Sequence, residues 1–234
     1  MKFINQTNVF FTTLGISILF VLLASTMQNV NAHQKQLVSI GGKDYLFVVG
    51  SANEPVFIDD KSGVELFAYT PINATDPLNS DSNSTIPIQD LEKTLKVEVS
   101  AGDQKKVLDF DPVEKDPGHY TATFFPTVQT TYNYRVFGNV SNIPISLVWT
   151  CSPGSVDEAT VISNSSVKIS DNVILKEVVG GFPCPEPRAD SSFPEKYTSN
   201  VDMNNTITNL QKEISQLTQN TTNMSTPSAK INIK

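Results

Sequence analysis

The chain has 234 residues, of which 39% are hydrophobic and only 18% are charged, with a formal net charge of −7 and a sequence pI near 4.8. This length suffices for one or two domains, and Asn, Ser and Thr supply much of the polarity, as is typical of exported proteins. An acidic chain without a cluster of Lys and Arg argues against binding to nucleic acid and against docking on anionic lipid.

The first 32 residues have the three parts of a secretory signal peptide. Lys2 supplies positive charge, Leu14–Ala24 is a short apolar run, and Val30 and Ala32 lie at the −3 and −1 positions of a small-residue cleavage site. An uncleaved N-terminal anchor is the alternative, although the apolar run is short for a membrane-spanning helix, and no later segment approaches about eighteen apolar residues. We therefore expect a secreted or cell-surface protein that begins at His33 and has no membrane span after cleavage.

The cysteines and the N-glycosylation sequons are also typical of an exported protein. Cys151 and Cys184 are the only cysteines, and in an oxidising compartment we expect one disulfide, which would contribute roughly 3–4 kcal/mol. Neither has a second Cys or a His close by in sequence, so a zinc site is not indicated. Seven N-x-S/T sequons remain after the expected cleavage site, and they predict N-glycosylation. They lie at Asn73, Asn83, Asn139, Asn164, Asn204, Asn220 and Asn223.

Residues 33–152 contain about eight short segments of strand character, separated by turns at intervals of about 8–12 residues, and no convincing helix. Gly41-Gly42 and Asp59–Gly63 are turn signals between apolar runs, and residues 94–100 alternate between apolar and polar. Residues 71–89 have no periodicity and are rich in Pro, Asn and Ser, so we expect a long exposed loop. The pattern predicts an all-β domain, an Ig-like antiparallel β-sandwich over residues 33–152.

The stretch His119–Gly138 carries the strongest strand signal. Two arms flank a turn, which predicts a β-hairpin, and in each arm apolar residues alternate with polar ones, so that one face meets a core and the other meets water. We expect Trp149 to pack in the core as well. The expected core residues of the two arms are Tyr120, Ala122, Phe124, Tyr132, Tyr134 and Val136.

Beyond Cys151 the character of the sequence changes. Residues 153–200 contain one or two candidate strands, at 167–169 and 173–179, and we interpret them as an extension pinned back by the disulfide and followed by a linker. Residues 201–225 carry a helical heptad pattern, and 226–234 are expected to be a disordered tail. Ile at a and Leu at d favour a two-stranded coiled coil and a homodimer through residues 203–224, whereas an amphipathic helix that lies on the sandwich or frays is the alternative. The seam comprises Met203, Ile207, Leu210, Ile214, Leu217, Thr221 and Met224.

The sequence offers little support for catalysis. It lacks a G-x-S-x-G motif, a phosphate-binding loop and a dinucleotide-binding fingerprint. Two carboxylate pairs, Asp59 with Asp60 and Asp109 with Asp111, fall in turns, where solvated turn acids are the better interpretation than a glycosidase pair. We therefore expect no enzyme.

The two histidines suggest a metal site. Cleavage after Ala32 would leave His33 as the first residue, with an α-amine and an imidazole that can bind one metal ion. His119 is the only other imidazole, and Asp116 could add an oxygen ligand. A set of nitrogen and oxygen ligands of this kind suits Cu(II). The plainer alternatives are a solvated terminal His33 and a strand-edge His119.

These residues resemble those of exported Ig-like copper carriers of the CopC type. In that family an N-terminal His and a distal Asp-x-His bind Cu(II), which implies His33, Asp116 and His119 here. The chain departs from the pattern in having Asp-x-x-His, no Met-rich segment and a C-terminal extension.

Residues 117–138 also resemble the end of small exported Ig-like domains, including the YtkA-like group. Their T-Y-N-Y-R-V segment is similar to the Y-x-C-x-V strand of Ig domains, with Tyr134 in the Cys place and Tyr132 placed for a tyrosine corner. The polar, acidic mature chain is similar to exported proteins of ammonia-oxidising archaea.

The sequence favours a non-catalytic, secreted or cell-surface binding or structural module. An extracytoplasmic Cu(II)-binding protein that uses His33 and His119 is the main alternative, and a copper oxygenase is a distant third. An Ig-like sandwich is compatible with all three functions.

Overall fold

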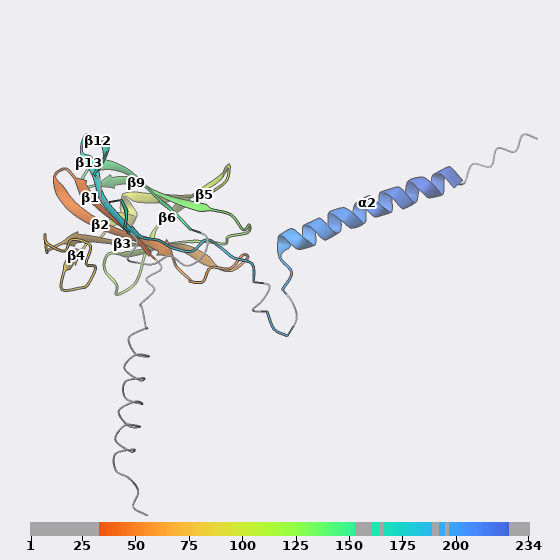
Figure 1. Ribbon diagram of the computed structural model, residues 1–234, viewed down its shortest axis with the longest axis horizontal. Coiled ribbons are helices and arrows are strands. Elements are labelled where there is room, and N and C mark those ends of the chain that lie inside the picture. Colours follow the sequence, from red (N-terminus) through yellow and green to blue (C-terminus); the bar gives the residue numbers. More distant parts are fainter. Residues whose placement is uncertain (1–32, 153–160, 164–165, 189–191, 195–196, 225–234) are drawn as a thin grey trace, which may run out of the picture. The chain divides into compact units, whose positions relative to one another are not determined.

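The computed structural model describes residues 33–152, 161–163, 166–188, 192–194 and 197–224, which belong to one compact unit. The strands gather into a body of two antiparallel sheets, and one uninterrupted helix follows them in the chain (Figure 1). The expected signal peptide at 1–32 and the expected tail at 226–234 lie outside the described residues.

The first sheet has the strand order β11-β13-β1-β2-β3-β8-β7, with β12 also paired to β13 and β4 paired to β3. Every pairing is antiparallel, and the Gly41-Gly42 turn joins β1 to β2 as the sequence predicted. The strands of this sheet are β1 (His33–Ile40), β2 (Lys43–Ser51), β3 (Ser62–Pro71), β4 (Thr85–Pro87), β7 (Asp111–Pro112), β8 (His119–Phe124), β11 (Val161–Ser163), β12 (Val167–Ser170) and β13 (Val173–Gly180).

The second sheet has the order β10-β9-β5-β6. Its outer strands are paired on one side only, and the exposed residues of β6 include two lysines, a common protection of a sheet edge. The strands are β5 (Leu95–Ala101), β6 (Gln104–Asp109), β9 (Tyr132–Val140) and β10 (Ile143–Thr150).

The core lies between the sheets and is built by the alternation that the sequence shows. Along β9 and β10 every second side chain is buried, and Trp149, Tyr120 and Tyr134 are the largest fully buried residues. Side chains from both sheets join one cluster, which confirms an all-β sandwich.

The prediction of a hairpin at His119–Gly138 is wrong in its pairing, although both strands exist and present the expected residues to the core. β8 pairs with β3 and β7 in the first sheet, whereas β9 pairs with β5 and β10 in the second. Residues 125–131 form no strand and carry the chain from one sheet to the other. The period-2 pattern fixed which face of each strand is apolar, but it did not fix which neighbour each strand pairs with.

The strands β11, β12 and β13, which follow Cys151 in the chain, belong to the first sheet. β13 lies beside β1 over most of its length, with Gln34 opposite Gly180 and Ile40 opposite Val173. The segment that we expected to be an extension therefore supplies an inner strand of the sandwich.

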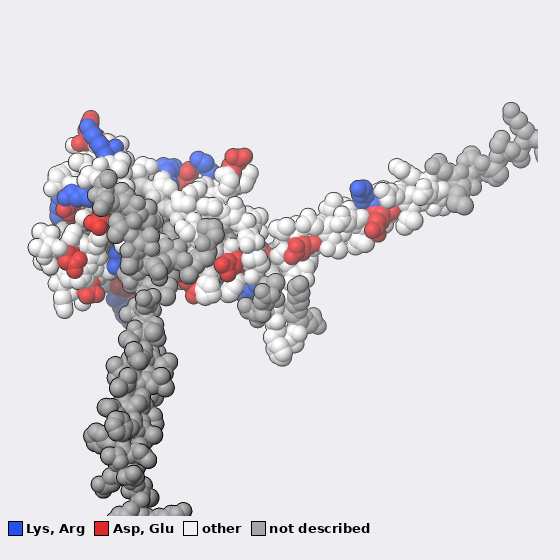
Figure 2. Space-filling view, viewed as in Figure 1, with Lys and Arg blue, Asp and Glu red and all other residues white. Residues whose placement is uncertain are grey.

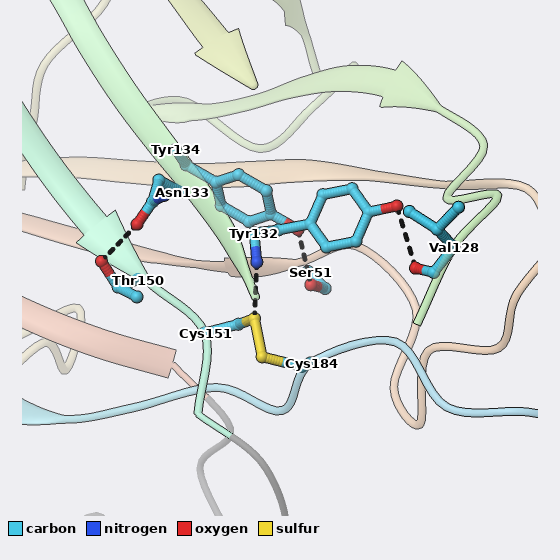
Figure 3. Close-up of a disulfide and its surroundings, with 8 residues drawn as sticks. All are labelled: Ser51, Val128, Tyr132, Asn133, Tyr134, Thr150, Cys151 and Cys184. Atoms are coloured by element: carbon cyan, nitrogen blue, oxygen red, sulfur yellow. Dashed lines mark hydrogen bonds between the residues drawn. A yellow bond between two sulfur atoms is a disulfide. The ribbon is translucent and has the colours of Figure 1, made fainter. Parts of the chain in front are cut away.

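The disulfide between Cys151 and Cys184 forms as predicted, with a Cα–Cα distance of 4.9 Å. It joins the residue that follows β10 to the segment after β13 and lies directly under Tyr132 (Figure 3). The backbone N–H of Tyr132 donates to Cys151 Sγ at 3.1 Å, and Phe182 stacks on Tyr134 with ring centroids 5.1 Å apart. The bridge thus fixes the C-terminal segment against the core.

The two tyrosines beside the disulfide match the Ig-like pattern. Tyr132 Oη donates to the carbonyl of Val128, four residues upstream, at 3.2 Å, which is the geometry of a tyrosine corner (Figure 3). Tyr134 is 1% exposed, and its hydroxyl contacts Ser51 Oγ at 3.1 Å. The fold is therefore a two-sheet antiparallel sandwich compatible with an Ig-like fold.

The stretch expected as one exposed loop, 71–89, is folded over part of its length. β4 pairs with the end of β3, and the 3₁₀-helix η1 (Leu91–Lys93) follows it. The intervening residues 72–84 form a surface loop whose ends are joined by a hydrogen bond from Ile72 N–H to the Ser84 carbonyl at 2.9 Å.

The helix α2 spans Asn200–Met224, within one residue of the prediction. Ser199 caps it by accepting the N–H of Asp202 at 3.1 Å.

Asp59 accepts the N–H of Asn200 at 3.2 Å and the hydroxyl of Tyr197 at 2.8 Å, and Arg188 forms an ion pair with Asp60. The first of the two carboxylate pairs therefore contacts the residues around the start of the helix, which the interpretation as solvated turn acids did not foresee.

Candidate functional site

Strand register places the two histidines on one face of the first sheet. His33 lies opposite Gly50 of β2, which lies opposite Glu65 of β3, so these three residues share a row. Because Gly50 has no side chain, the imidazole of His33 reaches across β2 to Glu65. His119 lies opposite Phe67, which is two residues beyond Glu65 in β3 and therefore on the same face of the sheet.

Both imidazoles converge on the carboxylate of Glu65. His33 Nε2 lies 2.9 Å from Glu65 Oε2, and His119 Nε2 lies 2.7 Å from Glu65 Oε1. The second contact is short but poorly aligned for a hydrogen bond, and it becomes an ion pair when His119 is protonated. The other ring nitrogen of His119, Nδ1, lies 2.8 Å from Asp116 Oδ2.

Within this cluster the pKa of Glu65 is lowered and the pKa of His119 is raised, because each group lies next to a group of opposite charge. Burial alone would raise the pKa of Glu65, but the contacts with the two imidazoles prevail and lower it to about 2. Burial would lower the pKa of His119, but Glu65 and Asp116 prevail and raise it. Glu65 is therefore an anion across the physiological range, and the protonated form of His119 is stabilised.

Glu54 is a third carboxylate near the histidines. Burial raises its pKa to about 7, against a smaller lowering by the charge of His33 and by the N–H of Ser51, which donates to Glu54 Oε1 at 3.3 Å. Glu54, in the loop between β2 and β3, therefore titrates near neutral pH, whereas Glu65 of β3 does not.

The side chain of Phe67 lies between the two imidazoles. Its ring stacks on His119 with centroids 4.1 Å apart and meets the edge of His33 at 5.8 Å. The aromatic contacts limit the orientations of both imidazoles, so the cluster is held by packing as well as by charge.

The arrangement differs from the copper set expected from sequence. His33 and His119 are brought together, but Asp116 faces Nδ1 of His119, and Glu65 lies between the two Nε2 atoms. Asp116 is thus placed to orient the imidazole, as carboxylates behind metal-binding histidines do. Across the residues that the structure describes, no group of three or more His, Cys, Asp or Glu side chains is arranged to hold a metal ion.

Sequence reasoning missed Glu65 and Glu54. A signal for Glu65 was present, because it alternates with the buried Val64 and Leu66 in a predicted strand and therefore lies on the opposite face. Its proximity to His33 depends on the β1–β2–β3 register, which the sequence did not reveal.

A second candidate site is the apolar seam of α2. All side chains described in the helix, from 200 to 221, are exposed, and the large apolar ones are between 47% and 66% exposed at Met203, Ile207, Leu210, Ile214 and Leu217. The alternative in which this helix buries its seam on the sandwich is therefore not observed. Few charges lie along the helix (Figure 2).

Two findings bear on classification. Within the described ranges, no helix has the length and apolar character to cross a membrane. Comparisons with protein-family models, with curated proteins and with solved structures found no match to this chain. The fold and the sites thus define a disulfide-bonded antiparallel β-sandwich with an exposed C-terminal helix.

Proposed function

We propose that the protein is a non-catalytic, secreted or cell-surface binding module, and that α2 joins two copies of it through a parallel coiled coil. The observation that carries this proposal is the exposed seam of α2, because an amphipathic helix obtains most of its stability from burying its apolar face. The disulfide fits an oxidising compartment outside the cytosol.

The heptad positions are compatible with a parallel pair. Ile207 and Ile214 occupy a, and Leu210 and Leu217 occupy d, the combination that favours two strands. Glu213, at a g position, would face Thr218, at an e position of the partner copy, so like charges do not oppose one another. The strong part of the seam is short, and we therefore expect a dimer that dissociates on dilution.

Sedimentation equilibrium of the chain from residue 33 to 234 tests this proposal. We expect twice the monomer mass, and a monomer for Ile214→Asp and for the chain that ends at residue 200. Gln219→Asp adds the same charge at an f position, away from the seam, and should remain dimeric. A monomeric parent chain would refute the coiled coil, and a dimer of the chain ending at 200 would assign the interface to the sandwich instead.

A second candidate function is extracytoplasmic Cu(II) binding, favoured by the convergence of His33 and His119. The two imidazoles contact Glu65, so binding would require them to exchange this carboxylate for the metal or to share it. The bound ion would be held by the imidazoles and, after cleavage at Ala32, by the α-amine of His33. The resemblance to CopC-type carriers belongs to this candidate.

N-terminal sequencing of exported material and a copper titration followed by electron paramagnetic resonance test this candidate. A start at a residue other than His33, or a spectrum unchanged in His119→Ala, would refute it. Asp116→Asn keeps both imidazoles and should weaken binding without abolishing the type-2 signal, because its role is to orient His119.

A further inference from the structure

The sequons that the structure describes differ in the hydrogen-bond partner of the Ser or Thr hydroxyl at their third position. In three of them the hydroxyl is engaged elsewhere: Thr85 Oγ1 donates to the Asp81 carbonyl at 3.1 Å, Ser141 Oγ contacts Tyr45 Oη at 3.0 Å, and Thr206 Oγ1 donates to the Asp202 carbonyl at 2.9 Å. These residues belong to the sequons of Asn83, Asn139 and Asn204. Thr85 is in addition only 4% exposed.

The sequon of Asn73 is arranged differently. Thr75 Oγ1 donates to Asn73 Oδ1 at 2.8 Å, and the backbone N–H of Thr75 donates to the same oxygen at 3.0 Å. All three residues of the sequon are exposed, and they lie in the loop between β3 and β4 rather than in a strand or a helix. The side-chain amide nitrogen of Asn73 is left directed away from these two bonds.

This geometry bears on the chemistry of N-glycosylation. An amide nitrogen is a poor nucleophile because resonance delocalises its lone pair onto the carbonyl oxygen. Two donors on Asn73 Oδ1 stabilise the negative charge that grows on this oxygen as the nitrogen gives up a proton, in the manner of an oxyanion hole. Once the proton has left, the nitrogen carries a lone pair in the amide plane that is not delocalised onto the oxygen.

We propose that Asn73 is the preferred N-glycosylation site of the folded chain, because its sequon already holds the hydrogen bonds that activate the amide. The co-substrate is an oligosaccharide linked to lipid pyrophosphate. The Asn73 nitrogen forms a bond to the anomeric carbon, the bond from that carbon to the phosphate oxygen breaks, and lipid pyrophosphate leaves with the electron pair. The amide proton passes to a base of the transferase.

The surroundings of the competing sequons explain the preference. Asn139 lies in β9 opposite Pro144, and its N–H is bonded to the Thr94 carbonyl, so the backbone is held extended. Asn204 lies in α2, where residues two apart point in different directions, so that Thr206 does not face it. Refolding these segments into a turn would break strand or helix hydrogen bonds.

The test uses the folded, disulfide-bonded chain from residue 33 to 234, made without glycans. It is incubated with a purified single-subunit oligosaccharyltransferase and a lipid-pyrophosphate-linked oligosaccharide, and initial rates at each Asn are measured by peptide mass mapping. We expect Asn73 to be modified at least about tenfold faster than Asn83, Asn139 and Asn204, the effect of roughly one additional hydrogen bond in the transition state.

Two controls separate geometry from local sequence. The reduced and denatured chain should lose the preference, since its sequons no longer hold different conformations, and Thr75→Ser should keep it, because the donor hydroxyl remains. Equal rates in the folded chain, no reaction at Asn73, or the same preference in the denatured chain would each overturn the proposal. A short acceptor peptide establishes that the transferase is active.

Discussion

The β-sandwich and the helix α2 use their apolar residues in opposite ways. Trp149 of the sandwich is fully buried, whereas Leu217 of the helix is 66% exposed. The sandwich places its apolar faces against each other and closes the C-terminal segment onto the core with a disulfide. The helix also has a regular apolar pattern, but its seam side chains from Met203 to Leu217 are exposed. The sandwich thus covers its apolar faces within the chain, whereas the described part of the helix seam is left uncovered.

The largest effect on the sandwich should come from its core. Trp149→Ala removes the largest fully buried side chain and should lower the free energy of unfolding by about 3–5 kcal/mol, through lost burial and a residual cavity. Trp149→Phe should cost much less, because the indole N–H has no hydrogen-bond partner to lose. Chemical denaturation measures both, with Val148→Ala on the exposed face of the same strand as control. A loss for Trp149→Ala no larger than for Val148→Ala would contradict the assigned core.

The next largest effect should come from the disulfide. Replacing Cys151 and Cys184 together by Ser should cost about 2–4 kcal/mol, because the unfolded chain regains the freedom of the closed loop. Denaturation curves with and without reductant measure the difference, and reductant should leave the double variant unaffected. A stability of the parent chain that is insensitive to reductant would show that the bridge is not formed in solution.

Glu54 should make stability depend on pH. A carboxyl whose pKa is higher in the folded chain, here about 7 against an ordinary value of 4.5, holds its proton more tightly when folded. This stabilisation is fully present below pH 4.5 and is lost as the pH rises through about 7. Because Glu54 is only half-buried, solvent screens part of this effect, and Glu54→Gln should gain about 1–2 kcal/mol relative to the parent chain at about pH 8, and little at about pH 5.

The measurement is chemical denaturation of the metal-free protein at both pH values. Glu114→Gln removes the same charge from an exposed side chain and should show no such difference between the two pH values. An identical pH dependence in Glu54→Gln and the parent chain would contradict the burial of this carboxyl.

The smallest effect on the sandwich should follow removal of the helix. Ending the chain at residue 200 should change the free energy of unfolding of the sandwich by less than about 0.5 kcal/mol, because the described side chains of α2 are all exposed. Near-ultraviolet circular dichroism and denaturation midpoints of the two chains give the comparison, measured below the concentration at which the parent associates. A large loss of stability would mean that the helix packs on the sandwich.

Local pattern sufficed to predict much of the architecture. Alternation identified the buried residues of β8 and β9, heptad spacing placed α2 within one residue, and two cysteines in a chain expected to be exported predicted the bridge. The pairing of β8 and β9 was beyond such patterns. A strand with one apolar face fits either sheet of a sandwich, and the choice depends on contacts between residues far apart in the chain.

The candidate site, too, was predicted from the sequence only in part. The rarity of histidine drew attention to His33 and His119, and the structure brings them to one carboxylate. Alternation places Glu65 on the face opposite Val64 and Leu66, but it does not single out Glu65 among the strand glutamates as that carboxylate. Its role arises because β3 lies between β2 and β8 and because Gly50 leaves the path from His33 open.

By itself, the sequence determined the class of the fold, the faces of its strands, the disulfide and the amphipathic helix, because each depends on residues close together or on a single pair of cysteines. Only the tertiary structure decided that β11, β12 and β13 complete the first sheet, that Glu65 joins the two histidines, and that the described seam side chains of α2 remain exposed. These features depend on which surfaces meet, and that choice is made by the summed burial and hydrogen bonding of the whole chain.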